Sequence, residues 1–160
     1  MPRKVTVTSK KHAAAVMREM TTFLRLTAAL DLHTNQGVRN LENSTFSILD
    51  LLGSTDSMRP GQIAIVFRLG QSTMTRHIQE LERLGLVQKT TDPMDRRAVL
   101  VSLSKSGREV LAAETELRQN RLAREMASWS AHEKSEFARL LASINQNIVA
   151  RREADAVSSA

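Results

Sequence analysis

The stretch LERLGLVQKTTDPMDRRAVLVSLSKSG, residues 81–107, decides the fold. Within it, the β-rich runs LVQKTT and AVLVSL flank the turn former Asp92-Pro93, so they predict a β-hairpin. The tip of this hairpin carries Arg96 and Arg97. An arginine presented in this way can enter a DNA minor groove. In a purely structural alternative, we expect one of these arginines to pair with Asp92 or Asp95 and fix the turn.

The residues before the hairpin predict a helix-turn-helix. Apolar residues at three- and four-residue steps predict a long first helix over residues 13–32, and a second helix begins near Ser44 and stops at Gly53. A loop is expected at residues 55–57. Pro60 suits the first turn of a short helix, and GQSTMTRHIQELERLG predicts another helix, closed by Gly85.

The residues after the hairpin predict two further helices. Ser104 is a suitable N-cap for a helical segment that continues to about Arg152, with a break at residues 128–131. The final residues, 153–160, are expected to form a flexible tail. Trp129 lies near the break and is expected in the core or at a dimer interface.

The helix over residues 72–84 has two different faces. On a helical wheel, Met74, Ile78 and Leu81 fall on one side, and polar or basic residues fall on the other. Such a polar face can donate to phosphates at its N-terminal end and read purine edges in a major groove, although an ordinary solvated face has the same composition. The polar side consists of Ser72, Arg76, Gln79 and Arg83.

Composition favours an anionic partner. Lysine and arginine number 23 against 17 aspartate and glutamate residues, which gives a formal net charge of +6 and a pI near 10.5. Only 3% of residues are aromatic and tyrosine is absent, so stacking platforms for single strands would be hard to build and duplex DNA is the expected partner. No apolar run approaches the roughly 20 residues that span a bilayer, so we expect a cytoplasmic protein without membrane contact.

Several functional classes are not supported by these residues. Cysteine is absent and the four histidines are dispersed, so neither a metal site nor thiol redox chemistry is expected. We find no glycine-rich phosphate loop and no Ser-His-acid arrangement in a recognisable context. We therefore expect no cofactor and no enzymatic activity.

With these elements in place, the chain resembles the MarR family of winged helix-turn-helix transcription regulators. Residues 81–107 carry the most specific similarity, and LENSTFSILDLLG, residues 41–53, is similar to the family's second helix. The resemblance extends over about residues 13–149. It implies a mainly α fold with a small β-hairpin wing and flanking dimerisation helices. The implied regions are 1–40 for N-terminal dimerisation, 41–103 for the DNA-binding lobe and 104–152 for C-terminal dimerisation.

The resemblance also implies roles for particular residues. Asp95 would orient the wing, and Arg96 or Arg97 would probe the minor groove. With the wheel analysis, the predicted DNA-binding set is Ser72, Thr73, Thr75, Arg76, Gln79, Arg83, Lys89, Arg96 and Arg97. A small-molecule effector is a further implied partner, and its candidate pocket residues are Arg25, His33 and Phe46.

The sequence departs from the family pattern at the third helix. Arg59 stands where a serine or threonine cap is frequent, and Gly70 replaces a frequent serine. Ile65 and Val66 are apolar where polar residues are usual, and Ile65 is expected either to pack against the wing or to form a small adhesive spot. Base preference therefore cannot be transferred from the family.

We therefore predict a sequence-specific duplex-DNA-binding regulator. It would act as a homodimeric repressor on a pseudo-palindromic operator, and a small molecule would release it from the DNA. A winged-helix module for protein–protein assembly is the alternative from another class. Within the main class, a constitutive binder or an activator is not separated by sequence.

Overall fold

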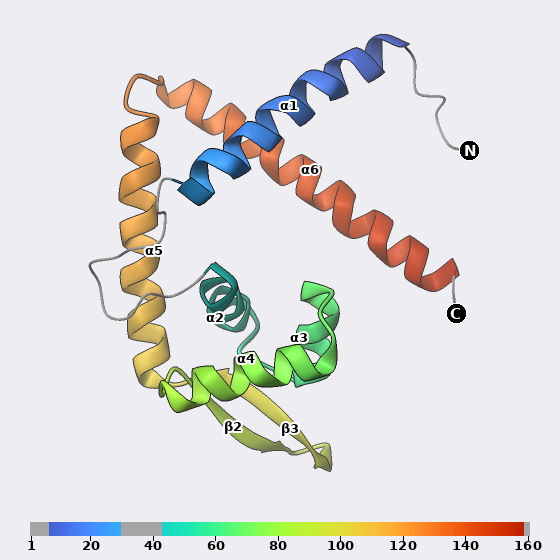
Figure 1. The fold of residues 1–160 in the computed structure, drawn as a ribbon, viewed down its shortest axis with the longest axis vertical. Helices are drawn as coiled ribbons and strands as arrows, with labels where there is room; N and C mark the ends of the chain where they lie inside the picture. The colour runs from blue at the N-terminus through green and yellow to red at the C-terminus, as the bar shows by residue number, and fades with distance from the viewer. Residues whose placement is uncertain (1–6, 30–42, 159–160) are drawn as a thin grey trace. The chain divides into compact units, whose positions relative to one another are not determined.

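The computed structural model describes residues 7–29 and 43–158 (Figure 1). It is mainly helical with a small three-stranded antiparallel sheet, as expected for a winged helix-turn-helix. The elements are α1 (Val7–Ala29), α2 (Asn43–Thr55), β1 (Ser57–Met58), α3 (Pro60–Phe67), α4 (Gln71–Arg83), β2 (Val87–Asp92), β3 (Asp95–Leu103), α5 (Lys105–Glu125) and α6 (Ala131–Ser158). Two compact units, residues 1–118 and 119–160, are described separately below.

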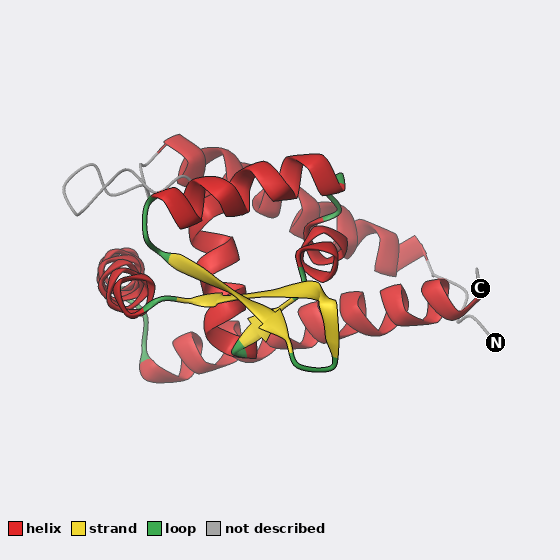
Figure 2. Ribbon diagram, turned by 90° about the horizontal axis from the view of Figure 1, so that it is seen from below, coloured by secondary structure: helices red, strands yellow, loops and turns green. Residues whose placement is uncertain are grey.

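The sheet has the order β1-β3-β2, and its strands are drawn in yellow in Figure 2. The predicted hairpin is confirmed as β2 and β3, which together with their connecting turn we call the wing. The short strand β1 was not expected, because its Ser57-Met58 lies where the sequence predicted a loop. Ser57 pairs with Ser102 and Met58 with Val101, so the third strand forms only through a distant segment of the chain.

The hydrophobic core of the first unit lies between α2, α3, α4 and the sheet. Met74, Ile78 and Leu81 are at most 1% exposed, which confirms the apolar side of the α4 wheel. They pack with Ile48, Leu49 and Leu52 of α2, Ile63 and Ala64 of α3, and Leu86, Val87, Val101 and Leu103 at the sheet. Burial of this side fixes which α4 residues remain outside, because residues three and four positions apart share one face of a helix.

The prediction that α2 stops at Gly53 was wrong. The helix continues to Thr55, and Asp56 takes the left-handed conformation with φ 61°. Gly53 is instead a place of close approach, since a Cβ there would lie 2.7 Å from Cδ2 of Leu111 in α5. Glycine at this position therefore serves helix packing, which has the same sequence signature as a helix end.

The start of α5 packs closely against Leu86, which lies between α4 and β2. Ser104 is the N-cap as predicted, and its Oγ accepts a hydrogen bond of 2.9 Å from the backbone N–H of Gly107. A Cβ on Gly107 would lie only 1.9 Å from the carbonyl oxygen of Leu86. The carbonyl of Leu86 also accepts from the N–H of Ser104 at 3.0 Å, so this corner admits no side chain at Gly107.

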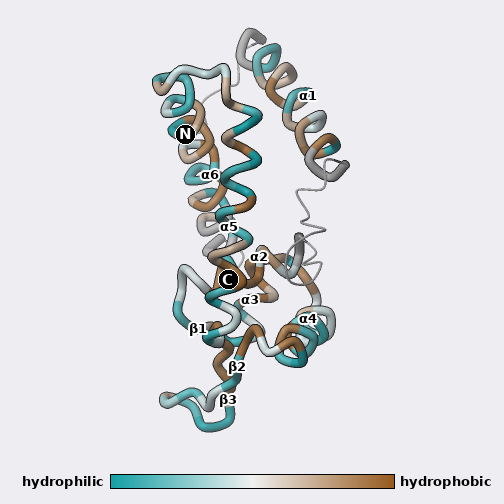
Figure 3. The backbone as a smooth tube through the Cα atoms, turned by 90° about the vertical axis from the view of Figure 1, so that its left-hand side faces the viewer, coloured by the Kyte–Doolittle hydropathy of each residue, from teal (hydrophilic) through white to brown (hydrophobic). Residues whose placement is uncertain are grey.

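The second unit contains the end of α5 and all of α6. A reciprocal cap begins α6, because Ser130 Oγ accepts from the N–H of Glu133 and the Glu133 carboxylate accepts from the N–H of Ser130. Trp129 packs edge-to-face on Phe137 with ring centroids 5.3 Å apart. Hydrophilic and hydrophobic residues alternate along α6 (Figure 3). The helix reaches Ser158, past residue 152 where the sequence suggested a tail.

Large apolar side chains are exposed along the long helices. On α6, Leu140 is 55% and Val149 51% exposed, and on α1 the values for Met17 and Leu24 are 62% and 65%. Within residues 7–29 and 43–158, no helix is both long and apolar enough to cross a membrane. These apolar stripes therefore stay exposed in the described part of a single chain.

Candidate nucleic-acid interface

The N-terminal half of α4 presents polar side chains outward. Ser72, Thr75, Arg76 and Gln79 are exposed and Thr73 is half-buried. Gly70 occupies the cap position and has no side chain, so the first-turn N–H groups receive no side-chain cap there. The Thr75 hydroxyl donates to the carbonyl of Gln71 at 2.7 Å, so its proton is used within the helix and the free donors at this end are the backbone N–H groups. The helix start is therefore open to an anion such as a phosphate.

The C-terminal half of α4 carries two carboxylates that pair with predicted DNA-binding cations. Arg83 donates to Glu80 through Nη2 at 2.6 Å and through Nε at 2.8 Å. This guanidinium holds the pKa of Glu80 below its ordinary value. Lys89, on β2, makes an ion pair with Glu82. Arg83 is on the exposed side of α4 as predicted and Lys89 is exposed on β2, but their charges are compensated by neighbouring glutamates.

The two wing arginines lie in an irregular part of the hairpin. Thr91 is opposite Val99 whereas Asp92 is opposite Asp95, so the register shift leaves Arg96 and Arg97 in an extra stretch of β3. Both arginines are exposed. Extra residues of this kind bend a strand and re-aim its side chains. The two exposed basic side chains thus belong to the irregular stretch of β3 that follows the turn.

Two aspartates shape the turn through the backbone. Asp92 Oδ1 accepts from the N–H of Met94 at 2.8 Å, and Asp95 Oδ1 accepts from the N–H of Arg97 at 3.1 Å. The expectation that a wing arginine would pair with one of them was wrong. Asp92 pairs instead with Arg59, which precedes α3 and is distant in sequence.

The Arg59–Asp92 contact is a charged pair in which two guanidinium nitrogens donate to one carboxylate oxygen. Arg59 Nη2 and Nε donate to Asp92 Oδ2 at 2.6 Å and 2.9 Å. The Asp92 side chain is 8% exposed and that of Arg59 43%. The N–H of Met94 and then the guanidinium of Arg59 hold the pKa of Asp92 below its ordinary value. The carboxylate is therefore ionised whenever the wing is folded near neutral pH.

Arg59 also begins α3, although not as a side-chain cap. Its N–H donates to Oε1 of Gln62 at 2.9 Å, and its carbonyl accepts from the N–H of Gln62 and of Ile63. Because the backbone caps the helix, the Arg59 side chain remains available for the wing. Ile65, farther along α3, is 77% exposed, so it does not pack against the wing.

The predicted effector residues are not brought together. Arg25 is exposed on α1, and His33 lies outside the described residues. Phe46 is half-buried with the guanidinium of Arg118 3.6 Å from its ring centroid. Arg118 in turn lies 3.8 Å from the buried carboxylate of Glu114. One face of Phe46 is thus already covered by a cation.

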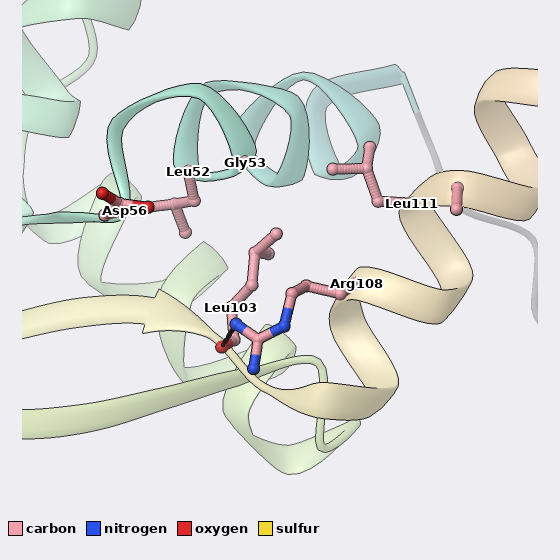
Figure 4. A pocket seen from close by; sticks show the side chains of 7 residues that line it. Leu52, Gly53, Asp56, Leu103, Arg108 and Leu111 are labelled. Atoms are coloured by element: carbon pink, nitrogen blue, oxygen red, sulfur yellow. Dashed lines mark hydrogen bonds between the residues drawn. The ribbon is translucent and has the colours of Figure 1, made fainter.

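A separate cavity of about 230 Å³ opens between the end of α2, the end of β3 and the start of α5 (Figure 4). Neither Arg25 nor Phe46 lines it. Arg108 reaches across its edge and donates to the carbonyl of Leu103 at 2.9 Å. Its lining consists of Leu52, Gly53, Asp56, Leu103, Arg108, Leu111 and Ala112. In the described part of the chain, no group of three or more histidine or acidic residues is arranged to hold a metal ion.

A helix-turn-helix with an open, polar recognition helix and an arginine-bearing wing defines a DNA-binding transcription regulator. The family model that matches residues 41–99 is that of the MarR family. The uncharacterized HTH-type transcriptional regulator YxaD of Bacillus subtilis strain 168 is 32% identical over 131 residues, which cover 82% of this chain and 91% of that protein. The chain belongs to the MarR family, whose members are non-enzymatic DNA-binding regulators.

Solved structures agree with this fold. RV1404 from Mycobacterium tuberculosis superposes with a TM-score of 0.72 at 24% identity and covers 84% of this chain and 92% of its own. FabT of Streptococcus pneumoniae, solved in complex with DNA, gives a TM-score of 0.69 at 18% identity and covers 85% of this chain and 96% of its own. At these identities the likeness concerns the fold alone.

The residues that sequence reasoning missed are Arg59, Glu80 and Glu82. Glu80 precedes Arg83 by one helical turn, so its pairing had a local signal. The contacts of Arg59 and Glu82 join separate elements, so no local signal in the sequence indicated them.

Proposed function

We propose that this regulator is a homodimeric repressor that binds a pseudo-palindromic operator. The carrying observation is that the open N-terminal face of α4 and the bulge with Arg96 and Arg97 belong to one packed lobe. This combination suits a contact in which a helix enters the major groove and an arginine enters the adjacent minor groove. FabT, which shares the fold, has been solved bound to DNA.

The residue roles follow from exposure and chemistry. Arg76 and Gln79 would read base edges, and Ser72 and Thr73 would contact phosphates with the first-turn N–H groups. Arg83 and Lys89 would contribute to phosphate binding only after their glutamate partners yield. Asp95 would shape the backbone that carries the wing arginines.

A dimer would cover the apolar stripes of the long helices. We propose that residues 1–40 and 104–152 form the dimer interface, which would remove from water the exposed side chains of α1 and α6. Two recognition helices would then read half-sites about 10 base pairs apart. Repression would follow from competition with polymerase for the operator.

We further propose that a small molecule lowers DNA affinity. The cavity beside Arg108 and the surroundings of Phe46 are the described places where such a ligand could bind. A screen of aromatic acids would record the thermal shift of the protein and the release of labelled operator. A ligand that shifts the melting temperature without releasing DNA would contradict ligand control.

The proposal is tested by selecting random duplex DNA with the purified protein. The selected sequences should contain a two-fold symmetric motif, and sedimentation should show two protomers per duplex. Transcription in vitro from a promoter containing the motif should fall as protein is added. Weak binding without a motif would instead favour the assembly module, to which the 77% exposure of Ile65 gives some support.

A further inference from the structure

We propose that Arg59 is a positioning residue that fixes the arginine-bearing bulge of the wing relative to the recognition helix. It would thereby set how strictly the regulator selects the DNA flanking the bases read by α4. This inference rests on the proposed DNA contacts of α4 and the wing. Arg59 itself touches no DNA in this proposal, and it acts through Asp92.

The carboxylate of Asp92 joins three parts of the lobe: strand β2, the turn and the residue before α3. Asp92 Oδ1 accepts from the N–H of Met94 in the turn, and Asp92 Oδ2 accepts from Nε and Nη2 of Arg59. Asp92 stands where the register shifts, at the base of the stretch with the two wing arginines. Holding this carboxylate therefore holds the point from which the bulge departs.

The Arg59 guanidinium faces the two aspartates that are opposite each other at the turn end of the bulge. Its Nη1 lies 3.9 Å from Oδ2 of Asp95, in addition to the bonds with Asp92. Asp95 Oδ1 in turn accepts from the N–H of Arg97. A cation between two carboxylates reduces their mutual repulsion and keeps both beside it. The guanidinium fork can meet both, which a lysine ammonium group could do less well.

The backbone of Arg59 is connected to the recognition helix, α4, through the hydrophobic core. The carbonyl of Arg59 accepts from the N–H of Ile63 at 3.2 Å, and Ile63 is fully buried in the core that contains Met74 and Ile78 of α4. The Arg59 backbone is thus part of the packed helix-turn-helix, while its side chain ends on the wing. A rotation of the wing relative to α4 would have to break this link.

The link is better suited to orientation than to folding. With the Arg59 side chain 43% exposed, water screens the pair and its contribution to global stability is small. By contrast, the angle of an arginine at a minor groove decides whether groove width is sensed at all. Loss of the link should therefore change which flanks are preferred more than it changes melting temperature.

The test uses the full-length protein and an operator obtained by selection with the wild type. Arg59→Gln and Asp92→Asn each remove the link, and Arg59→Asp combined with Asp92→Arg restores a pair of opposite polarity. The control for loss of one positive charge is the wild type at a raised salt concentration that matches its overall affinity to that of Arg59→Gln. Dissociation constants are measured on the operator and on versions with altered flanks or altered central half-site bases.

We expect Arg59→Gln and Asp92→Asn to reduce flank discrimination by about tenfold, the size of one lost arginine contact. Discrimination at the half-site bases should remain, the double variant should recover part of the flank preference, and the wild type at raised salt should keep its flank preference. Faster amide exchange at Met94 and Arg97 in Arg59→Gln, with only a small change in melting temperature, would support the same conclusion.

Other outcomes would overturn the inference. Full flank discrimination in Arg59→Gln would show that the link does not position the wing. Equal weakening on every sequence in Arg59→Gln, with Asp92→Asn unaffected, would make Arg59 a direct phosphate contact. If the wild type selects no operator, or if Arg76→Ala has no effect on the one selected, the proposed function itself has failed and the inference falls with it.

Discussion

Replacing Glu82 by glutamine should make the Lys89 ammonium group, which Glu82 neutralises in the wild type, available to bind DNA. In the wild type, the carboxylate of Glu82 pairs with Lys89, and the two side chains are 44% and 32% exposed. An approaching phosphate therefore meets an ion pair whose charges cancel. Glu82→Gln is nearly isosteric, removes the negative charge and leaves the Lys89 ammonium available to the DNA.

The expected size follows from counterion release. Each additional phosphate neutralised changes the slope of log affinity against log salt by about −0.9, so a dimer with two freed lysines should change by about −1.8. Between 50 and 200 mM salt, the variant should lose about tenfold more affinity than the wild type. The increase at low salt should be similar on every duplex, because phosphate contacts carry no sequence information.

The assay is fluorescence anisotropy of labelled operator and of random duplex over this salt range. Asp155→Asn is a matched control, since Asp155 is exposed near the end of α6, outside the proposed DNA-binding and dimer-forming residues, and its loss adds the same charge. Folding should be little affected in either variant, because exposed ion pairs contribute about 0 to 1 kcal/mol. If both variants change the salt slope equally, Lys89 does not contact DNA and the increase is only one of net charge.

Three further results are expected. Gly107→Ala should destabilise the fold by about 3 kcal/mol or more, because its Cβ would lie 1.9 Å from the Leu86 carbonyl oxygen. Gly61→Ala, whose Cβ would have its nearest neighbour at 4.0 Å, should change stability by less than about 1 kcal/mol, and urea denaturation would expose any failure of this contrast. The lowered pKa of Asp92 means that its ionised form stabilises the fold above about pH 4 and that this contribution disappears as pH falls through the lowered value. The melting temperature of Asp92→Asn should thus lie below that of the wild type at pH 7 and converge with it in acid, and a difference independent of pH would contradict this origin. Arg76→Ala should cost about 1 to 3 kcal/mol at one base pair, whereas Thr73→Ala should weaken all sequences alike, and equal losses on specific and random DNA for Arg76→Ala would remove its base-reading role.

Local patterns predicted much of this lobe. The apolar period of α4 identified its buried side, the Asp92-Pro93 turn identified the hairpin, and Ser104 identified the start of α5. Each signal depends on residues within a few positions of one another, so it can be recognised without the fold.

Contacts between distant segments were not predictable in this way. Arg59 and Asp92 are 33 positions apart, and nothing in either local sequence shows that they meet. Gly53 was misinterpreted because glycine permits both a helix end and a close approach of helices, and only the position of Leu111 distinguishes them. The residues proposed to touch DNA were found on exposed faces, but sequence did not show that two of the cations were paired with glutamates.

The close approaches of Gly107 to Leu86 and of Leu111 to Gly53 pack the first turns of α5 closely against the lobe. Helix α5 has 21 residues. At about 1.5 Å per residue it is a lever arm of about 31 Å, so a tilt of about 10° displaces its far end by about 5 Å. That displacement exceeds the base-pair step of about 3.4 Å. In a dimer assembled through the far ends of two such levers, a tilt too small to disturb the packing of either lobe would move the recognition helices out of step with their half-sites.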